Sequence, residues 1–419
     1  MRRHCLEARL LAGRSSLRVA LLAMLEPAGA GQALPRAFLR VGGRTLAQHQ
    51  LDLALAMDCQ RIVCIARELS HDMLALQHEA ENAGVHFHVV SGPRALASIV
   101  TAGDEVLVFA EGLLVAPQEA VALLDGVSVV LVQPVESGLA AGFERLDINH
   151  AAAGIIRIPG RLVESLSELP ADCDASSALT RIALQSGVAK RDVPAAAREG
   201  VRWRLVRDEV EAHATEPAWI RLHMGEARVP TPGYLLTRVA VRAIGPALLH
   251  AGSGSRNVAL AALSTMLMAL GSGWLGFTAL GLGLCAVAWL LSRSAGMLRR
   301  IERDSLDDPH ASVIPARVIS ALLDLEIILL VVWSNPMLPA SSVFDTAFAP
   351  FMLLSLTRLL PRAFDRPWAA WLEDRVLLAL LLAFAALAGV LIEAVEIIAV
   401  LLAFAGIAIP ASRGRITSA

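Results

Sequence analysis

The stretch 274-WLGFTALGLGLCAVAWLL-291 decides the fold of the second half of this chain. It contains no charged residue, and its length is close to the ~20 residues with which an α-helix crosses a bilayer. A backbone inside lipid must satisfy its own hydrogen bonds, so such a run predicts a helix. Five further apolar runs accompany it: Asn257–Gly271, Val318–Trp333, Phe344–Leu360, Val376–Leu391 and Ala394–Pro410. The sequence therefore predicts six membrane-spanning helices.

The polar segments between these runs alternate in charge. Gly271–Gly273 and Ser334–Val343 carry no charged residue. Arginines gather in the alternate segments and in the tail: Arg293, Arg299, Arg300, Arg303, Arg317, Arg362, Arg366, Arg375, Arg413 and Arg415. Because Lys and Arg collect in cytoplasmic loops, this pattern predicts a multi-pass protein of a bacterial-type inner membrane, with both termini in the cytoplasm.

The composition agrees with a membrane protein. Of the 419 residues 55% are hydrophobic, and the mean hydropathy is +0.57, which exceeds the values of ordinary soluble domains. The formal net charge is −2 and no basic cluster with interleaved aromatics occurs, so nucleic acid is not an expected partner. The five cysteines lack paired spacing, which indicates reduced thiols. Membrane lipid is the first expected partner.

Short strands and helices alternate before the apolar runs. The predicted strands are Leu17–Leu25, Arg61–Ala66, Val85–Val90, Glu105–Phe109, Val127–Val132, Gly154–Ile158 and Arg202–Val206. The predicted helices are Thr45–Asp58, Ser70–Ala83, Pro93–Ala102, Pro117–Leu124, Gly160–Leu166, Ala175–Gln185 and Asp208–Leu222. This alternation favours right-handed crossovers and a mostly parallel sheet.

The chain is thus expected to fold in three parts. Residues 1–222 would form a cytosolic α/β domain, and residues 257–419 a membrane domain of six helices. Residues 223–256 would form a linker containing an amphipathic helix, Thr231–His250, at the membrane surface or packed as a plain connector.

A glycine turn follows the first predicted strand, at Gly29 and Gly31. After the first strand of a parallel sheet, such a turn exposes backbone N–H groups that can hold a phosphate. The stretch 27-PAGAGQALPRAFLRVGGRTL-46 resembles the opening of sugar-nucleotide pyrophosphorylases and related GT-A-like (Rossmann-like) nucleotidyltransferases. Those enzymes carry an A-G-x-G-x-R-L turn, a P-K-x-L step and a G-x-P-L segment. The resemblance extends more loosely from about Leu17 to Leu222.

This resemblance implies phosphate-binding residues. Gly29 and Gly31 would wrap the phosphates of a nucleotide. Arg36 stands where the family has a lysine, and Ala33 stands where it has an arginine. Arg36 keeps the positive charge but differs from an ammonium in geometry.

The resemblance also implies where a metal would bind. Glu111 occupies the position of a metal-binding aspartate, and Leu205 the position of a second one. Phosphoryl transfer relies on Mg²⁺ and fixed cations to offset charge, so Mg²⁺ is expected only if a catalytic site survives. No catalytic residue is assigned.

The membrane half bears a second resemblance. A nucleotidyltransferase domain followed by six spans is the arrangement of a fused family that joins inositol-1-phosphate cytidylyltransferase to CDP-alcohol phosphatidyltransferase. The signature of the latter, D-x-x-D-G-x-x-A-R, is similar to 292-SRSAGMLRR-300 at Gly296 and Arg300. Ser292 and Ala295 replace its aspartates, and Asp324 is the one acidic residue recovered from its second half.

These replacements predict binding rather than transfer in the membrane half. One carboxylate cannot assemble a two-metal centre, although Asp324 is retained, with Glu111, as a candidate metal ligand. Gly296, Arg299 and Arg300 would instead attract an anionic lipid head group.

The sequence favours a relative of these fused enzymes in which the catalytic motifs are degenerate, and it favours binding over catalysis. The expected partners besides lipid are a nucleotide or a phosphorylated head group, and a homodimer is also considered. One alternative is an active nucleotidyltransferase that uses Arg36 and Glu111. Another is a membrane carrier with a polar site at Asp324 and Glu326, where charge inside a span is costly. Pairing of Asp324 with a basic residue such as Arg317 is the structural alternative to such a site.

Overall fold

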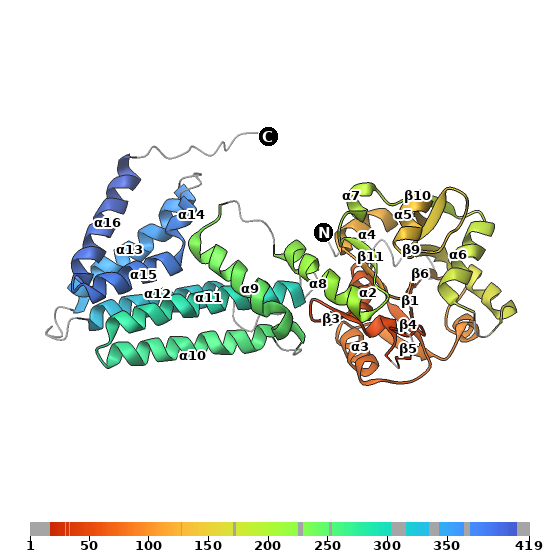
Figure 1. Cartoon of the computed structure of the whole chain (residues 1–419), viewed down its shortest axis with the longest axis horizontal. Coiled ribbons are helices and arrows are strands. Elements are labelled where there is room, and N and C mark those ends of the chain that lie inside the picture. Colours follow the sequence, from red (N-terminus) through yellow and green to blue (C-terminus); the bar gives the residue numbers. More distant parts are fainter. Residues whose placement is uncertain are drawn as a thin grey trace, which may run out of the picture. The chain divides into compact units, whose positions relative to one another are not determined.

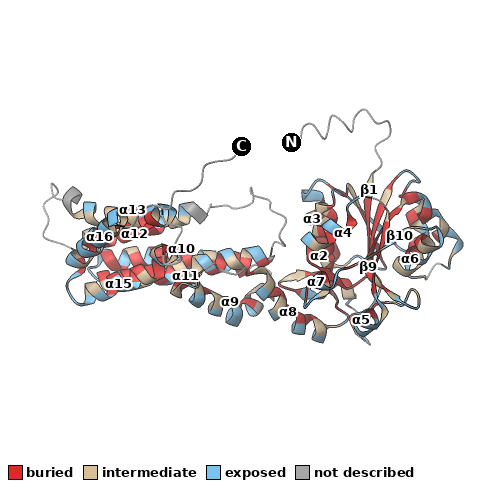
Figure 2. Cartoon of the chain, turned by 90° about the horizontal axis from the view of Figure 1, so that it is seen from above, coloured by how far each residue is buried: buried red, intermediate tan, exposed pale blue. Residues whose placement is uncertain are grey.

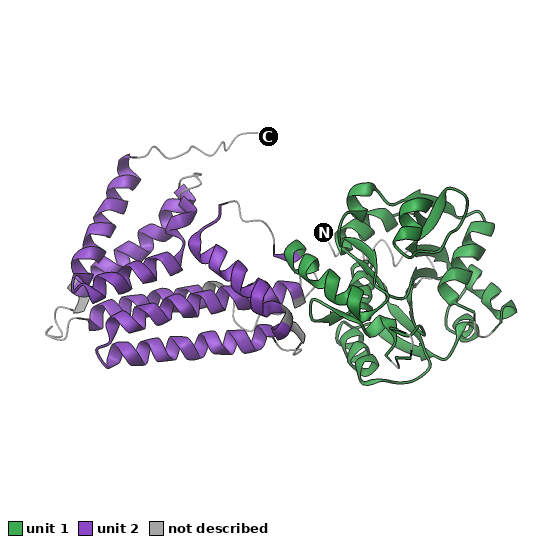
Figure 3. Cartoon of the chain, viewed as in Figure 1, with its two compact units in different colours: residues 1–222, 303–306 green, residues 223–302, 307–419 purple. Residues whose placement is uncertain are grey.

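The computed structural model describes residues 17–29, 31–32, 34–126, 128–170, 173–224, 229–250, 254–302, 316–334, 343–363 and 369–408. These residues divide into two compact units (Figure 3). The first unit reaches to Leu222, and the second, which we call the helical unit, begins at His223.

A seven-stranded sheet forms the centre of the first unit (Figure 1). Its strands are, in spatial order, β10 (Ala189–Asp192), β8 (Val129–Pro134), β9 (His150–Pro159), β6 (Glu105–Phe109), β1 (Arg18–Met24), β4 (Arg61–Ala66) and β5 (His86–Val90). All run parallel except β9, which is antiparallel to both β6 and β8. Apolar side chains alternate between two cores: Leu22 of β1 lies in one and Leu21 in the other. The predicted, mostly parallel sheet is confirmed.

Helices cover both faces of this sheet, and their inward sides are buried (Figure 2). The core around Leu22 includes residues of α2 (Leu46–Ala56), α3 (His71–Asn82) and α4 (Pro117–Leu124). The core around Leu21 includes residues of η2 (Pro93–Ser98), η3 (Gly160–Glu168) and α6 (Ala175–Gln185). Both faces of the sheet are therefore closed to water, as a parallel sheet requires.

Two small antiparallel pairs complete the first unit. β2 (Arg40–Val41) pairs with β3 (Arg44–Thr45), and β7 (Leu113–Val115) pairs with β11 (Trp203–Leu205). The second pair places the chain after β11 beside the chain that leaves β6. The remaining elements are η1 (Arg36–Phe38), α5 (Val135–Ala140), α7 (Ala195–Arg198) and α8 (Glu209–His223).

Four predicted elements, β4, β6, α4 and α6, match the structure residue for residue. The predicted α-helices Pro93–Ala102 and Gly160–Leu166 are wrong, because both segments form 3₁₀-helices. Pro93 and Leu96 are buried in one, and Val163 and Leu166 in the other. Residues three apart lie on one face of a 3₁₀-helix, so that winding buries both side chains of each pair.

The helical unit consists of eight helices over its described residues (Figure 1). They are α9 (Pro232–His250), α10 (Gly254–Trp274), α11 (Thr278–Glu302), α12 (Ala316–Trp333), α13 (Val343–Ala363), α14 (Ala369–Leu372), α15 (Arg375–Leu387) and α16 (Leu391–Ala408). Gly271–Gly273, which the sequence places as a turn between the first two apolar runs, is instead helical: α10 continues to Trp274 and the chain turns at Gly276, with φ of 87°. Gly273 packs against Leu330, where a Cβ would clash.

Three described helical segments are long and apolar enough to cross a membrane: Gly254–Trp274, Thr278–Ile301 and Leu391–Ala408. Arg375–Leu387 is apolar but shorter. All six predicted runs lie largely within helices, yet only these three meet both requirements of length and apolar composition. α12 is not among the three, and its 18 residues include Asp324 and Glu326. The three helices indicate membrane association.

Candidate functional site

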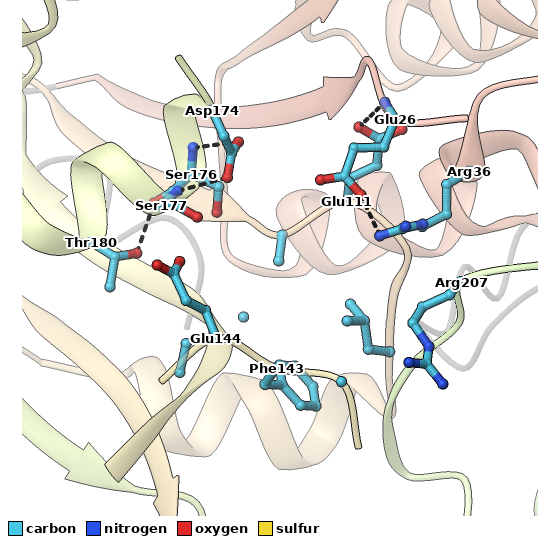
Figure 4. A pocket seen from close by; sticks show the side chains of 15 residues that line it. Glu26, Arg36, Glu111, Phe143, Glu144, Asp174, Ser176, Ser177, Thr180 and Arg207 are labelled. Atoms are coloured by element: carbon cyan, nitrogen blue, oxygen red, sulfur yellow. Dashed lines mark hydrogen bonds and ion pairs between the residues drawn. The ribbon is translucent and has the colours of Figure 1, made fainter. Parts of the chain in front are cut away.

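A cavity of about 280 Å³ lies in the first unit, where β1 and β6 end (Figure 4). The carboxyl ends of parallel strands are where open α/β sheets bind ligands. The strand β9 and the helix α6 contribute the opposite wall, and the chain after β11 contributes a third side. The polar residues that line the cavity are Glu26, Arg36, Glu111, Glu144, Asp174, Ser176, Ser177, Thr180 and Arg207.

Glu111 follows β6 and is 7% exposed. The backbone N–H groups of Leu25 and Glu26 donate to its Oε2 at 2.8 and 3.0 Å. Its buried Oε1 has no hydrogen-bond partner among the described residues. Burial raises the pKa of Glu111 to about 7, although the backbone N–H groups of Glu26, Leu25 and Ala37 favour the ionised form. The carboxyl can therefore gain or lose a proton near neutral pH.

Arg36 reaches the same cavity from η1. Its guanidinium forms an ion pair with Glu26, while its buried Nε has no hydrogen-bond partner among the described residues. Gly112 makes this approach feasible: it adopts φ of 82°, and a Cβ there would clash with Arg36 Cδ and Val206 O. One cation is thus paired with Glu26 at the cavity that Glu111 also lines.

The opposite wall carries acidic and hydroxyl side chains from α6 and from the turn before β9. Asp174 caps α6 by accepting hydrogen bonds from the backbone N–H groups of Ser176 and Ser177, both at 3.1 Å. The Thr180 hydroxyl donates to Ser176 O at 2.8 Å. Glu144 forms an ion pair with Arg181. These groups are mutually engaged, so this wall is preorganised and polar.

The predicted glycine turn adjoins the cavity but does not line it. Pro27 and Pro35 form an isolated antiparallel bridge that closes the loop at its base. Gly31 adopts φ of 82°, is exposed, and would meet nothing within 4 Å if it carried a Cβ. Gly29 precedes it with a partly exposed backbone. Ala33 lies outside the described residues. The structure therefore brings Arg36 and Glu111 together and leaves Gly29 and Gly31 on the connecting loop.

The position of the second family aspartate also lies at this cavity. Leu205 lines it and is 8% exposed, and Arg207 lines it two residues later with its guanidinium on Glu211. No group of three His, Cys, Asp or Glu side chains within the described residues could hold a metal ion. Leu205 thus gives this cavity an apolar side chain at the position where the resemblance implied a second aspartate.

Sequence reasoning missed Glu144, Asp174, Thr180 and Arg207. They come from three separate parts of the chain: the segment before β9, α6 with its N-cap, and the segment after β11. An N-cap pattern at Asp174, just before the predicted helix Ala175–Gln185, was the one local signal for any of them.

The predicted residues of the membrane half lie in the helical unit. Gly296, Arg299 and Arg300 belong to the last two turns of α11, where Gly296 and Arg300 are exposed and Arg299 is half-buried. Nothing lies within 4 Å of the place a Cβ would take at Gly296. This end of the helix therefore presents a basic surface.

Asp324 of α12 lies in a buried ion-pair cluster. Arg375 Nε donates to its Oδ1 at 2.8 Å, and Arg358 approaches its Oδ2 to 2.6 Å. Arg375 also donates to the Thr357 hydroxyl at 2.9 Å. The partners of Asp324 are thus on α15 and α13. The side chain of Arg317, suggested as a partner from the sequence, lies outside the described ones.

Comparison with known proteins yields structural matches alone. No family model and no curated protein sequence matches this chain. A protein from Bacillus anthracis assigned as a glucose-1-phosphate thymidylyltransferase, solved with sucrose, is 15% identical with a TM-score of 0.36. The match covers 49% of this chain and 95% of that protein.

The inositol-1-phosphate CTP transferase of T. maritima is 14% identical with a TM-score of 0.37. This match covers 47% of the present chain and 92% of that enzyme. Both of these solved proteins are described as nucleotidyltransferases, and each match covers about half of this chain.

Proposed function

We propose that this chain is an integral membrane protein whose first unit binds a nucleotide or a phosphorylated head group without transferring it. The observation that carries the proposal is the composition of the cavity at the ends of β1 and β6. It retains a cation, Arg36, and a buried carboxyl, Glu111, but has Leu205 where a second metal-binding carboxylate would be required. A site of this kind can attract phosphate more readily than it can gather Mg²⁺.

The geometry of the glycine turn supports phosphate binding. Gly31 is exposed, has positive φ and is free of neighbours at its Cβ position, so its backbone is accessible to a ligand. Backbone N–H groups in such turns form concave sites for anions. Arg36, at the far side of the same loop, would add a fixed positive charge.

The membrane half is proposed to descend from a CDP-alcohol phosphatidyltransferase and to have lost that activity. Its motif has Ser292 and Ala295 in place of aspartates, and Asp324 is engaged by Arg375 and Arg358. Arg299 and Arg300 would hold an anionic head group at the membrane surface. Six spans with both termini in the cytoplasm remain the proposed topology, from the alternation of arginines along the sequence.

Nucleotide binding is tested on the full chain in detergent, titrated with each of the common nucleoside triphosphates in the presence of Mg²⁺. Gly31→Val should reduce the affinity of any binder at least tenfold, because the side chain fills the space of the phosphates. Gly84→Val is the matched control: Gly84 also has positive φ, at 78°, is exposed and meets nothing within 4 Å. Absence of binding by the unaltered chain, or equal loss in both variants, would refute the proposal.

The absence of transfer is tested in parallel. Protein in lipid with Mg²⁺ or Mn²⁺, a CDP-activated lipid and a panel of alcohol acceptors should give no product above background. Metal-dependent product that disappears in Asp324→Asn would show that a reduced carboxylate set is sufficient for transfer.

A second candidate function, active nucleotidyl transfer, is favoured by one specific observation. Glu111 Oε1 has no partner among the described residues, and burial raises the pKa of Glu111 to about 7, so the carboxyl can exchange a proton at neutral pH. Pyrophosphate release from a nucleoside triphosphate and a sugar or inositol phosphate, abolished in Glu111→Gln, would establish this alternative. Binding without pyrophosphate release would exclude it.

A further inference from the structure

Glu326 lies in the middle of α12 and is buried inside the helical unit. It is 2% exposed, and neither oxygen of its carboxyl group has a hydrogen-bond partner among the described residues. Asp324, two residues earlier, is also buried but lies in the ion-pair cluster with Arg375 and Arg358. The two acidic residues of this helix therefore differ: one is paired and the other is not.

Apolar side chains surround Glu326 above and below along the helix. On one side Leu323 packs with Met266 of α10 and Ala288 of α11. On the other side Ile327 and Leu330 pack in the core that includes Leu282 of α11. The carboxyl thus lies between two apolar layers, where α12 contacts α10 and α11.

The titratable groups on the neighbouring helices do not offset a negative charge at Glu326. On α11 the Cys285 thiol lies beside the carboxyl, and a thiol is at most a weak donor that carries no positive charge. On α13 Arg358 is paired with Asp324, and Arg362 is exposed in the last turn. These neighbours leave the carboxyl without a cation.

Among the described side chains, the remaining helices packed nearby add no cation at this level. On α15 Arg375 is paired with Asp324. On α10 the one described basic residue is Arg256, in the first turn. It is separated along that helix by about 20 Å from Ala269, a member of the same core as Ile327.

An ionised carboxylate without a cation or donor is costly in such surroundings, whereas a neutral carboxyl is tolerated. We propose that Glu326 is a proton-binding site of the helical unit, neutral while α11 and α12 are packed and ionised only when they separate. Proton uptake and the packing of these two helices are then linked, because each favours the other. This property is independent of ligand binding by the first unit.

The test uses the full chain in lipid vesicles and dicyclohexylcarbodiimide, an apolar reagent that adds to protonated carboxyl groups. The carboxyl proton moves to a reagent nitrogen and the carboxyl oxygen bonds to the central carbon, so the labelled peptide gains the mass of one reagent molecule. Mass spectrometry of digested protein should place the label on Glu326. Labelling should be several-fold greater at about pH 6 than at about pH 9, because the open form loses its proton at the higher pH.

Two controls separate burial from general reactivity. A charged, water-soluble carbodiimide should label the exposed Glu393 of α16 and leave Glu326 unlabelled. The variant Glu326→Gln should lose the apolar label, and Glu393→Gln should retain it at Glu326. Absence of apolar label at Glu326 in the unaltered chain, or labelling by the charged reagent at the same rate as Glu393, would overturn the proposal.

A stability measurement tests the same protonation state without any reagent. If Glu326 is neutral when packed, Glu326→Gln should unfold within a few degrees of the unaltered chain at about pH 6 and at a higher temperature than it at about pH 9. A variant that is less stable at both pH values would show that the carboxylate form stabilises the bundle, and would overturn the proposal independently of any labelling.

Discussion

Burial of the Glu111 carboxyl makes the stability of the first unit depend on pH. The pKa of this carboxyl is raised from 4.5 to about 7, chiefly by burial. Between about pH 4.5 and pH 7, Glu111 is therefore protonated in the folded protein and ionised in the unfolded chain. Stability contributed by this group is present at low pH and is lost as the pH rises through that range.

We expect Glu111→Gln to remove this dependence on pH. The amide oxygen can still accept hydrogen bonds from Leu25 and Glu26, but the side chain cannot ionise. The free energy of opening the β6 region, measured by hydrogen exchange of its amides in the full chain, should fall by about 3 kcal/mol from pH 4.5 to above pH 7 in the unaltered protein. It should be nearly flat in the variant over that range.

Glu136→Gln is the control, because Glu136 is exposed and outside the cavity. This variant should retain the slope of the unaltered protein. An equal slope in Glu111→Gln and in the unaltered protein would mean that another group takes up the proton.

At the scale of elements, the ion-pair cluster joins α12, α13 and α15. The Arg375 side chain is 4% exposed and donates to Asp324 through Nε at 2.8 Å and Nη2 at 3.3 Å. The Asp324 carboxylate is the negative charge that offsets it. Removing that carboxylate leaves a buried guanidinium without a counter-charge, which is more costly than the pair itself is favourable.

Asp324→Ala should therefore destabilise the helical unit by about 3–5 kcal/mol, measured as thermal unfolding of the full chain in detergent. Glu393→Ala, which removes an exposed carboxylate from the first turn of α16, should change the free energy of unfolding by less than about 0.5 kcal/mol. Equal stability of the two variants would show that Arg375 finds another partner or remains solvated.

At the scale of the whole molecule, the number of spans decides on which side each end of the helical unit lies. Six spans place both ends on the same side of the membrane, whereas three spans place them on opposite sides. A reporter fused before Met1 and another fused after Ala419 should both be cytoplasmic. One inserted at Ser341 should be external, because the segment Ser334–Val343 carries no charge while the arginines lie on the other side.

The informative measurement is whether the two terminal reporters lie on the same side of the membrane. Termini on opposite sides would exclude six spans and favour an odd number, such as the three helices that are long and apolar enough. A cytoplasmic reporter at Ser341 together with cytoplasmic termini would mean that α12 and α13 do not cross.

Local patterns in the sequence determined which segments of this protein are strands and which are helices. Strand β6 and helix α4 could be predicted to the residue, because alternating or helical spacing of apolar residues depends on near neighbours alone. The same holds for the apolar runs. Arg36 and Glu111 were named from a resemblance to a family motif, and both line one cavity. The direction of a strand cannot be predicted from such spacing: nothing in the sequence of β9 shows that it is antiparallel to β6 and β8.

Only the tertiary structure decided which distant side chains meet. Arg375 is 51 residues from Asp324 in the chain, and their pairing depends on how α12 and α15 pack. Glu326, on the same helix, meets apolar side chains because it lies on another part of the helix surface. In the first unit, Thr180 faces Glu111 across the cavity for a similar reason. The spacing of apolar residues shows which face of a helix or strand is buried. The contact partners of a side chain depend on how whole elements pack, and this packing is determined by the entire chain.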